Sequence, residues 1–364
     1  MLHVKQAILT LEDGTVFEGK SFGSEKPATG EVVFHTAMTG YPENLSDPSF
    51  TGQILVSTYP MIGNYGVPFE NNNRGFQNFF SSRKLHISGL VISDYSFEFS
   101  HWSAEKSLSE WLKEYNIPGI FDVDTRALTK ILRDKGSMSG KIEFGDETID
   151  FLHPDQENLV KRVSCLEREV YGDGDYRVVL VDCGVKTNTI PCLLNRGATV
   201  IRVPWDYDFS SEDFDGVFIS NGPGNPELCD ATIQNIKKVL NGNRPIMGVC
   251  IGNLLLARAS GAETFKLKSG HRSQNQPVLM KGTNRCFITS QNHSYAVVPE
   301  SLPADWEVLF TNANDSTIEG IRHKTKPFFG AQFCPEVNCG PGDTQFLIDD
   351  FFQKIKEFRT MKND

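Results

Sequence analysis

Short apolar runs separated by turn residues fill the first part of the chain and predict a β-rich domain with a few helices. Asp13-Gly14 lies between two apolar runs, which is a hairpin signal. Asp124 is a suitable N-cap for a helix that Gly136 ends. The expected strands cover residues 7–11, 15–17, 30–38, 53–60 and 86–97, and the expected helices cover 107–115 and 125–136. We therefore assign residues 1–150 to an N-terminal α+β domain.

A polar segment separates this domain from the rest of the chain. Residues 145–174 are polar, contain one proline and end in Gly-Asp-Gly, as is typical of a connection between domains. We place a linker at 151–175 and a second domain at 176–364. The length of 364 residues fits two domains, because one hydrophobic core rarely grows past about 250–300 residues.

The second domain alternates apolar strands with helices over short connections. Its first run, 177–184, is continuously apolar, as a buried parallel strand should be. Further strands are expected at 198–204, 216–224 and 245–250, and helices at 187–195, 226–240, 252–259 and around Leu347–Phe358. This alternation predicts an α/β fold with a doubly wound, mostly parallel sheet. Ligands of such sheets bind at the carboxyl ends of the strands.

Charge and composition exclude several classes of function. Lys and Arg number 36 against 46 Asp and Glu, and no Lys/Arg-rich run occurs, so a nucleic-acid partner is not expected. No apolar stretch approaches the roughly 18 residues of a membrane span, and the first residues do not read as a signal or transit peptide. The eight cysteines include no C-x-x-C pair, which argues against a zinc site and a disulfide framework. We expect a cytoplasmic protein without a metal or membrane partner.

The sequence GVCIG, residues 248–252, lies where a strand is expected to turn sharply into a helix. It is the cysteine counterpart of the G-x-S-x-G nucleophile turn. The helix N-terminus that follows favours the thiolate of Cys250. A lone cysteine is more often an inert buried residue, but the strand, the turn and both glycines together favour a nucleophile.

A second motif, SNGPGNP at 220–226, follows another expected strand. Its glycines allow backbone N–H groups to point at a developing oxyanion. An ordinary turn before a helix that starts with proline is the alternative interpretation. A third motif, QFCPE at 332–336, follows a further strand-like run.

Together these motifs resemble the small, glutamine-hydrolysing subunit of carbamoyl-phosphate synthetase, which is a class I glutamine amidotransferase. The resemblance extends over nearly the whole chain. It rests on GEVVFHTAMTGYPENLSDPSFTGQILVSTYPMIGNYGVP, DVDTRALTKILRDKGSMSGKI, SNGPGNP, PIMGVCIGNLLLARASGAETFKLKSGHRSQNQPV, FITSQNHSYAV, LFTNANDSTIEGI and QFCPEVNCGPGDT. Other class I amidotransferases resemble only the second half.

The resemblance implies roles for individual residues. Cys250 matches the nucleophile that forms a γ-glutamyl thioester, and Glu336 matches the carboxylate that orients the catalytic imidazole. Gly224 and the backbone of Ile251 match the groups that stabilise the oxyanion. The residues that match glutamine-binding positions are Gly222, Asn292, Tyr295 and, from the N-terminal domain, Ser49.

The chain departs from the family pattern at three positions in these motifs. Cys334 stands where the family has the general-base histidine, and a thiol with its ordinary pKa of about 8.5 is a poor substitute. Leu254 replaces a glutamine that contacts the substrate, and Ser294 replaces a glycine. His293 and His271 are candidate substitute bases, although a role outside the site is more common for such histidines.

Three hypotheses about function follow from the resemblance and these departures. The first is a glutaminase subunit that passes ammonia to a large synthetase subunit, where ATP and Mg²⁺ act; this chain itself then needs no cofactor. The second is a non-catalytic subunit that supports an ammonia-dependent synthetase. The third, a hydrolase of γ-glutamyl conjugates, is disfavoured by the N-terminal domain. The pathways that the resemblance implies are pyrimidine and arginine biosynthesis.

Overall fold

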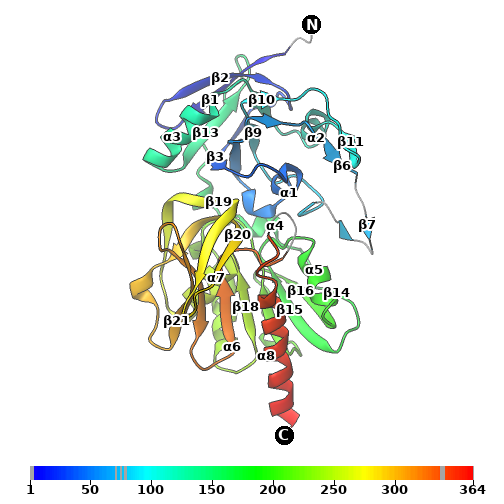
Figure 1. Cartoon of the computed structure of the whole chain (residues 1–364), viewed down its shortest axis with the longest axis vertical. Helices are drawn as coiled ribbons and strands as arrows, with labels where there is room; N and C mark the ends of the chain where they lie inside the picture. The colour runs from blue at the N-terminus through cyan, green and yellow to red at the C-terminus, as the bar shows by residue number, and fades with distance from the viewer. Residues whose placement is uncertain (1–3, 70–71, 74–75, 78–79, 337–340, 364) are drawn as a thin grey trace. The chain divides into compact units, whose positions relative to one another are not determined.

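Two units make up the structure, which is a computed structural model describing residues 4–69, 72–73, 76–77, 80–336 and 341–363 (Figure 1). The first unit comprises Met1–Glu157 together with Lys268–Ser273, and the second comprises Asn158–Leu267 and Gln274–Asp364. The segment expected as a linker contains a helix, α4 (Val160–Val163), and a strand, β14 (Glu169–Tyr171).

A closed β-barrel forms the centre of the first unit. Its strands follow the order β1 (Gln6–Leu11), β13 (Met138–Glu143), β3 (Ala28–His35), β4 (Gln53–Ser57), β9 (Gly89–Val91), β12 (Gly119–Phe121) and β2 (Val16–Ser21). Short strands pair outside the barrel: β5 (Met61–Ile62) with β10 (Asp94–Tyr95), β6 (Val67–Pro68) with β11 (Ala104–Lys106), and β7 (Asn72–Asn73) with β8 (Phe76–Gln77). The predicted β-rich domain is confirmed. Strand β13 and the closed barrel that it joins were not predicted from the sequence.

The helices of this unit are α1 (Tyr41–Leu45), α2 (Leu108–Glu114) and α3 (Thr125–Lys135). The Asp124 carboxylate accepts a hydrogen bond from Ala127 N at 2.8 Å, and Gly136 ends α3 with a φ of 97°. Both ends of the predicted helix are therefore set by the residues named for them.

A ten-stranded sheet forms the second unit, in the order β14, β16 (Ala198–Pro204), β15 (Tyr176–Asp182), β17 (Gly216–Ile219), β18 (Ile246–Val249), β23 (Phe328–Ala331), β22 (Ile318–His323), β20 (Cys286–Val297), β19 (Thr264–Met280) and β21 (Trp306–Asn312). The pairs from β16 to β23 are parallel, which confirms the predicted parallel sheet. The extension from β22 onward is antiparallel where its register is given.

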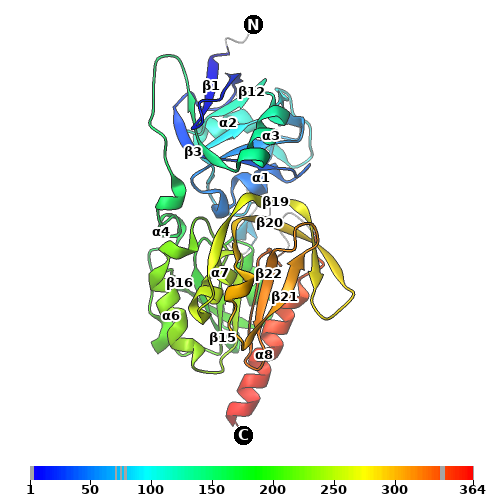
Figure 2. The same cartoon turned by 90° about the vertical axis from the view of Figure 1, so that its left-hand side faces the viewer.

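Helices cover both faces of this sheet, as expected for a doubly wound fold (Figure 2). One apolar cluster joins Val217 and Ile219 to residues of α6 (Asp230–Leu240) and α7 (Ile251–Ser260). Phe218 points to the other face and contacts Phe351 of α8 (Phe346–Asn363), with 6.1 Å between ring centroids. A shorter helix, α5 (Thr189–Leu194), follows β15. Within the described residues, no helix combines the length and apolarity that crossing a bilayer requires.

Candidate active site

Cys250 lies on a strained turn between β18 and α7. Its backbone has φ 55° and ψ −112°, a conformation that residues other than glycine rarely adopt. A Cβ on Gly248 would lie 2.4 Å from Gly252 O, and one on Gly252 would lie 2.2 Å from Ile219 O. The two glycines thus permit the close packing that holds the cysteine at the carboxyl end of a parallel strand.

The thiol of Cys250 is nearly enclosed, with 3% of the residue exposed. Its Sγ donates to Asn292 O at 3.7 Å, and its backbone N–H donates to Ala331 O at 2.8 Å. The side-chain amide nitrogen and oxygen of Asn292 are both buried without a hydrogen-bond partner in the described structure. Buried polar atoms are normally paired, so this amide, on the residue whose backbone carbonyl contacts the thiol, is suited to receive a polar ligand.

The SNGPGNP loop follows β17 and packs against the loop that follows β15. A Cβ on Gly222 would lie 1.8 Å from Cys183 O, so only glycine fits there. Asn221 holds the neighbouring loop by donating to Gly184 O at 3.0 Å and accepting from Lys186 N at 3.3 Å. Gly224 has a φ of 90°, within the left-handed region.

Cys334 and Glu336 follow β23, the strand next to β18. The Cys334 backbone N–H donates to Ser290 O at 3.2 Å, and its Sγ accepts from Lys186 Nζ at 3.4 Å. The Glu336 carboxylate is buried and accepts from Thr189 Oγ1 at 3.1 Å. Cys334, which the resemblance places at the position of the family's histidine, is thus a thiol in contact with the side-chain nitrogen of Lys186.

The structure brings Cys250 and Cys334 to the ends of adjacent parallel strands. The Sγ of Cys250 contacts Asn292 O, and the backbone N–H of Cys334 contacts Ser290 O. Asn292 and Ser290 are two positions apart in β20, which is about 7 Å along a strand. Neither sulfur forms a disulfide with another cysteine that the structure describes. Ile251 is the first residue of α7, where the backbone N–H groups have no partner within the helix.

The other predicted substrate-binding residues are spread over both units. Leu254 is 2% exposed and lies in the same apolar cluster as Tyr295, which explains why a leucine is stable there. Ser294 is half-buried in β20. Ser49 belongs to the first unit, where its backbone N–H donates to the Asp47 carboxylate at 2.9 Å.

The two candidate substitute bases differ in their surroundings. His293 is buried, with Nδ1 at 2.9 Å from Tyr295 O and Nε2 at 3.2 Å from Gln291 Oε1. Its Nε2 also lies 3.6 Å from the Glu319 carboxylate. Both ring nitrogens therefore have partners other than Cys250. His271 is also buried, in the part of β19 that groups with the first unit.

The sequence did not point to Lys186 and Thr189 as parts of this site, whereas Asn253 stands with Leu254 where the family pattern has His-Gln. Asn253 donates to Gln332 Oε1 at 2.9 Å and so ties the start of α7 to the end of β23. Lys186 and Thr189 follow β15, and a polar segment after the first strand of a doubly wound sheet was the available signal. The hydrogen bonds from Lys186 to Cys334 and from Thr189 to Glu336 each join residues nearly 150 positions apart in the sequence. No local sequence pattern reveals such contacts.

Four other cysteines are held in the protonated form. Burial raises the pKa of Cys165 and Cys229 to about 12 and that of Cys192 to about 11, with the Glu336 charge adding to the Cys192 shift. Burial also raises the pKa of Cys183 well above its usual value. These thiols are unreactive by this criterion, since the thiolate is the nucleophile.

Two family models match the chain. Residues 9–142 match "Carbamoyl-phosphate synthase small chain, CPSase domain", and residues 179–354 match "Glutamine amidotransferase class-I". Together they cover most of the sequence.

Curated relatives match over almost the whole chain. The human protein named carbamoyl-phosphate synthase (ammonia), mitochondrial, is 48% identical over 96% of this chain and 24% of its own length. Multifunctional protein CAD of Squalus acanthias is 49% identical over 97% of this chain and 16% of its own length. Multifunctional protein pyr1-3 of Dictyostelium discoideum is 48% identical over 98% of this chain and 17% of its own length. The chain thus spans a quarter or less of these proteins.

Proposed function

Because the chain belongs to the carbamoyl-phosphate synthase small-chain family and carries a class I glutamine amidotransferase domain, we propose that it hydrolyses glutamine at Cys250. The ammonia released would pass to a large synthetase portion that uses ATP and Mg²⁺ to make carbamoyl phosphate. The observation that supports this proposal best is the strained turn at Cys250, whose thiol contacts the backbone of Asn292, a residue with an unpaired buried amide.

The chemistry follows from the order of groups around Cys250. Its sulfur attacks the side-chain amide carbon of glutamine, and the carbonyl electrons move to the oxygen. Backbone N–H groups at Ile251 and Gly224 are the proposed donors to that oxyanion. The C–N bond then breaks, ammonia leaves with an added proton, and a γ-glutamyl thioester remains. Water attacks the thioester, which gives glutamate and frees the thiol.

Glutamine recognition is assigned to groups on both sides of this turn. The Asn292 amide can donate to one polar group of the ligand and accept from another. Gly222 and Tyr295 are proposed to shape the same site.

A second candidate function is a non-catalytic subunit of a synthetase that uses free ammonia. Cys334 in place of the base and the buried Leu254 favour it. The name of the human relative includes ammonia, which supports the same alternative.

The nitrogen donor separates the two candidates. The full chain, together with its synthetase portion, is given ATP and bicarbonate with either glutamine or ammonium, and carbamoyl phosphate is measured. Synthesis from glutamine that Cys250→Ser abolishes, while synthesis from ammonium persists, supports hydrolysis. Synthesis from ammonium alone supports the non-catalytic subunit.

The partner and the location are further proposals. A large synthetase portion is the expected partner, since the curated relatives are much longer than this chain. Pyrimidine and arginine synthesis are the expected destinations of the product. A cytoplasmic location follows from the scattered cysteines and is tested by cell fractionation.

A further inference from the structure

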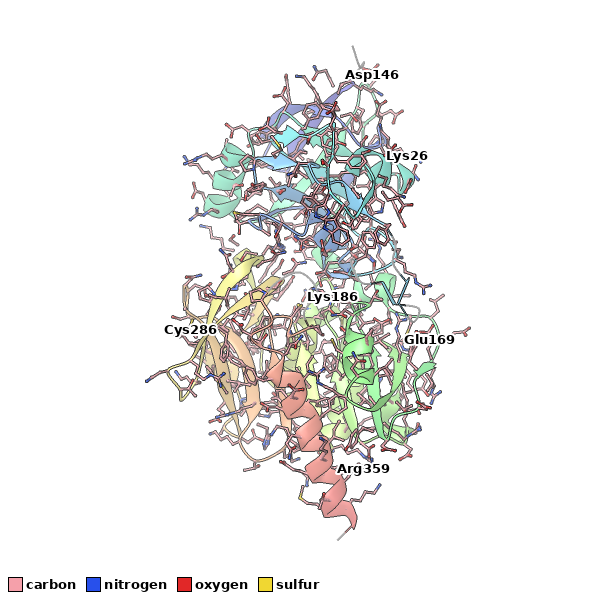
Figure 3. All side chains as sticks on the ribbon, turned by 45° about the vertical axis from the view of Figure 1, so that its right-hand side comes forward. Lys26, Asp146, Glu169, Lys186, Cys286 and Arg359 are labelled. Carbon is pink, nitrogen blue, oxygen red and sulfur yellow. The ribbon has the colours of Figure 1, made fainter. Side chains whose placement is uncertain are left out.

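The contact between Lys186 and Cys334 is unlike that of an ordinary buried thiol. Lys186 is 5% exposed, and its Nζ lies 3.4 Å from the Cys334 sulfur (Lys186 is labelled in Figure 3). An ammonium group has three donors and no acceptor, so the sulfur must accept. A neighbouring cation favours the thiolate over the neutral thiol.

The loop that carries Lys186 is held in place from several sides. The Asp182 carboxylate accepts from the backbone N–H groups of Gly184 and Val185 at 2.9 and 2.8 Å. Asn221 accepts from the backbone N–H of Lys186 at 3.3 Å. The lysine therefore reaches Cys334 from a fixed backbone, which is what a positioning residue requires.

The carboxylates on neighbouring elements have donors of their own. Glu336 accepts from Thr189 at 3.1 Å, Asp182 accepts from Arg202 at 2.6 Å, and Glu319 accepts from Asn312 at 3.0 Å and lies near His293. Cys250 and Cys183 are further thiols that directly follow strands of this sheet.

We propose that Lys186 is a positioning residue that holds Cys334 as a thiolate, and that this thiolate takes the acid–base role of the missing imidazole. The inference rests on the proposed glutamine hydrolysis. Cys334 is the base, and Lys186 stays an ammonium throughout and acts only through the sulfur.

The proton steps balance with these two thiols. The Cys334 thiolate takes the Sγ proton of Cys250 as the Cys250 sulfur bonds to the amide carbon. Cys334 then returns this proton to the nitrogen as the C–N bond breaks and ammonia leaves. In the second half, Cys334 takes a proton from water as the water oxygen attacks the thioester carbon. It gives that proton to the Cys250 sulfur as the C–S bond breaks.

The first experiment measures the thiolate without relying on activity. In the full chain carrying Cys250→Ser, alkylation of Cys334 by iodoacetamide is followed from pH 5 to 10 by peptide mapping. The exposed Cys286 serves as the internal reference. We expect half-maximal reactivity of Cys334 below pH 7, against about 8.5 for an ordinary thiol.

Lysine variants then identify the cause. Lys186→Met should lower the Cys334 rate at pH 6.5 by about 10-fold or more, because the thiolate loses its counter-charge. Lys186→Arg should keep most of the rate. Lys238→Met is the matched control, since Lys238 pairs with Asp208 on the surface. A Cys334 that titrates like Cys286, or that ignores Lys186→Met, overturns the proposal.

The second experiment tests the acid–base role with Cys250 intact. Lys186→Met should lower kcat for glutamine hydrolysis at pH 7 by about 10-fold, move the acid limb of the pH profile upward and leave KM unchanged. Cys334→Ser should lower kcat as well. An unchanged kcat overturns the role. A chain that hydrolyses no glutamine, yet shows the predicted Cys334 titration, refutes the proposed function and the acid–base role while supporting the ion pair.

Discussion

Replacing Cys334 by histidine should exchange the proposed thiolate base for the imidazole that the family has at this position. General acid–base catalysis is worth about 10²–10⁴-fold, or about 3–5 kcal/mol of barrier, and this range is the ceiling for Cys334→His. Glu336 lies two residues away and already accepts a hydrogen bond from Thr189, so a carboxylate is at hand to orient an imidazole.

Lys186 should limit the gain. Its ammonium lies 3.4 Å from the present sulfur and would oppose the imidazolium that forms during the reaction. Two like charges about 4 Å apart repel by about 4 kcal/mol at an effective dielectric constant of 20, unless the lysine side chain turns away. About 4 kcal/mol offsets about 10³-fold of that ceiling, so we expect a gain of at most about 10-fold in kcat, with little change in KM.

The assay compares glutamine and ammonium as nitrogen donors for the full chain with its synthetase portion. Cys334→His should raise only the glutamine-dependent rate, because the base acts on the thioester and not in the synthetase. Cys286→His, at an exposed thiol, is the control and should change neither rate. An unmodified chain that already turns over glutamine at about 1–10 per second would refute the reasoning, as would equal gains with both donors.

Three further predictions rest on other residues. Cys250 should be the thiol most reactive toward a γ-glutamyl electrophile; equal labelling of Cys286, seen by peptide mapping, would contradict this. Leu254→Gln should lower the glutamine KM by several-fold through one added hydrogen bond, and because it buries an amide in an apolar cluster it should lower the melting temperature unless glutamine is present. Burial lowers the pKa of His86 to about 4, so the unfolded chain binds its proton first and stability should fall between pH 6.5 and 4. This loss of unfolding free energy is up to about 3 kcal/mol. His86→Asn should make stability less dependent on pH in this range, as measured by thermal unfolding at several pH values. An unchanged pH dependence would exclude His86 as its source.

Local signals in the sequence were sufficient where a single residue determines the backbone. Asp124 and Gly136 bound α3 as predicted, and the two glycines around Cys250 allow the predicted turn. Pro226 was expected to begin a helix, but it begins a single 3₁₀ turn, and α6 starts at Asp230. Proline suits the start of either kind of helix, so the sequence could not distinguish them.

Features that depend on distant pairing were not predicted. Strand β13 reads MSGKIE, without an apolar run, and it is a strand because β1 and β3 pair with its two edges. Strands β19 and β20 are long and carry many polar residues, and their antiparallel pairing has no local signature. The contact between Lys186 and Cys334 was not predicted for the same reason, because it depends on which strand ends become neighbours.

The discontinuous first unit has a consequence for the order in which the chain is made. The stretch Lys268–Ser273 completes that unit, where Lys268 O and Arg272 O accept hydrogen bonds from the backbone N–H groups of Ser137 and Thr36. A ribosome synthesises this stretch more than a hundred residues after Glu157. The barrel strands can pair while the nascent chain still grows, but these two backbone bonds must wait until most of the second unit has emerged. The last step in assembling the N-terminal half is therefore timed by translation of the C-terminal half.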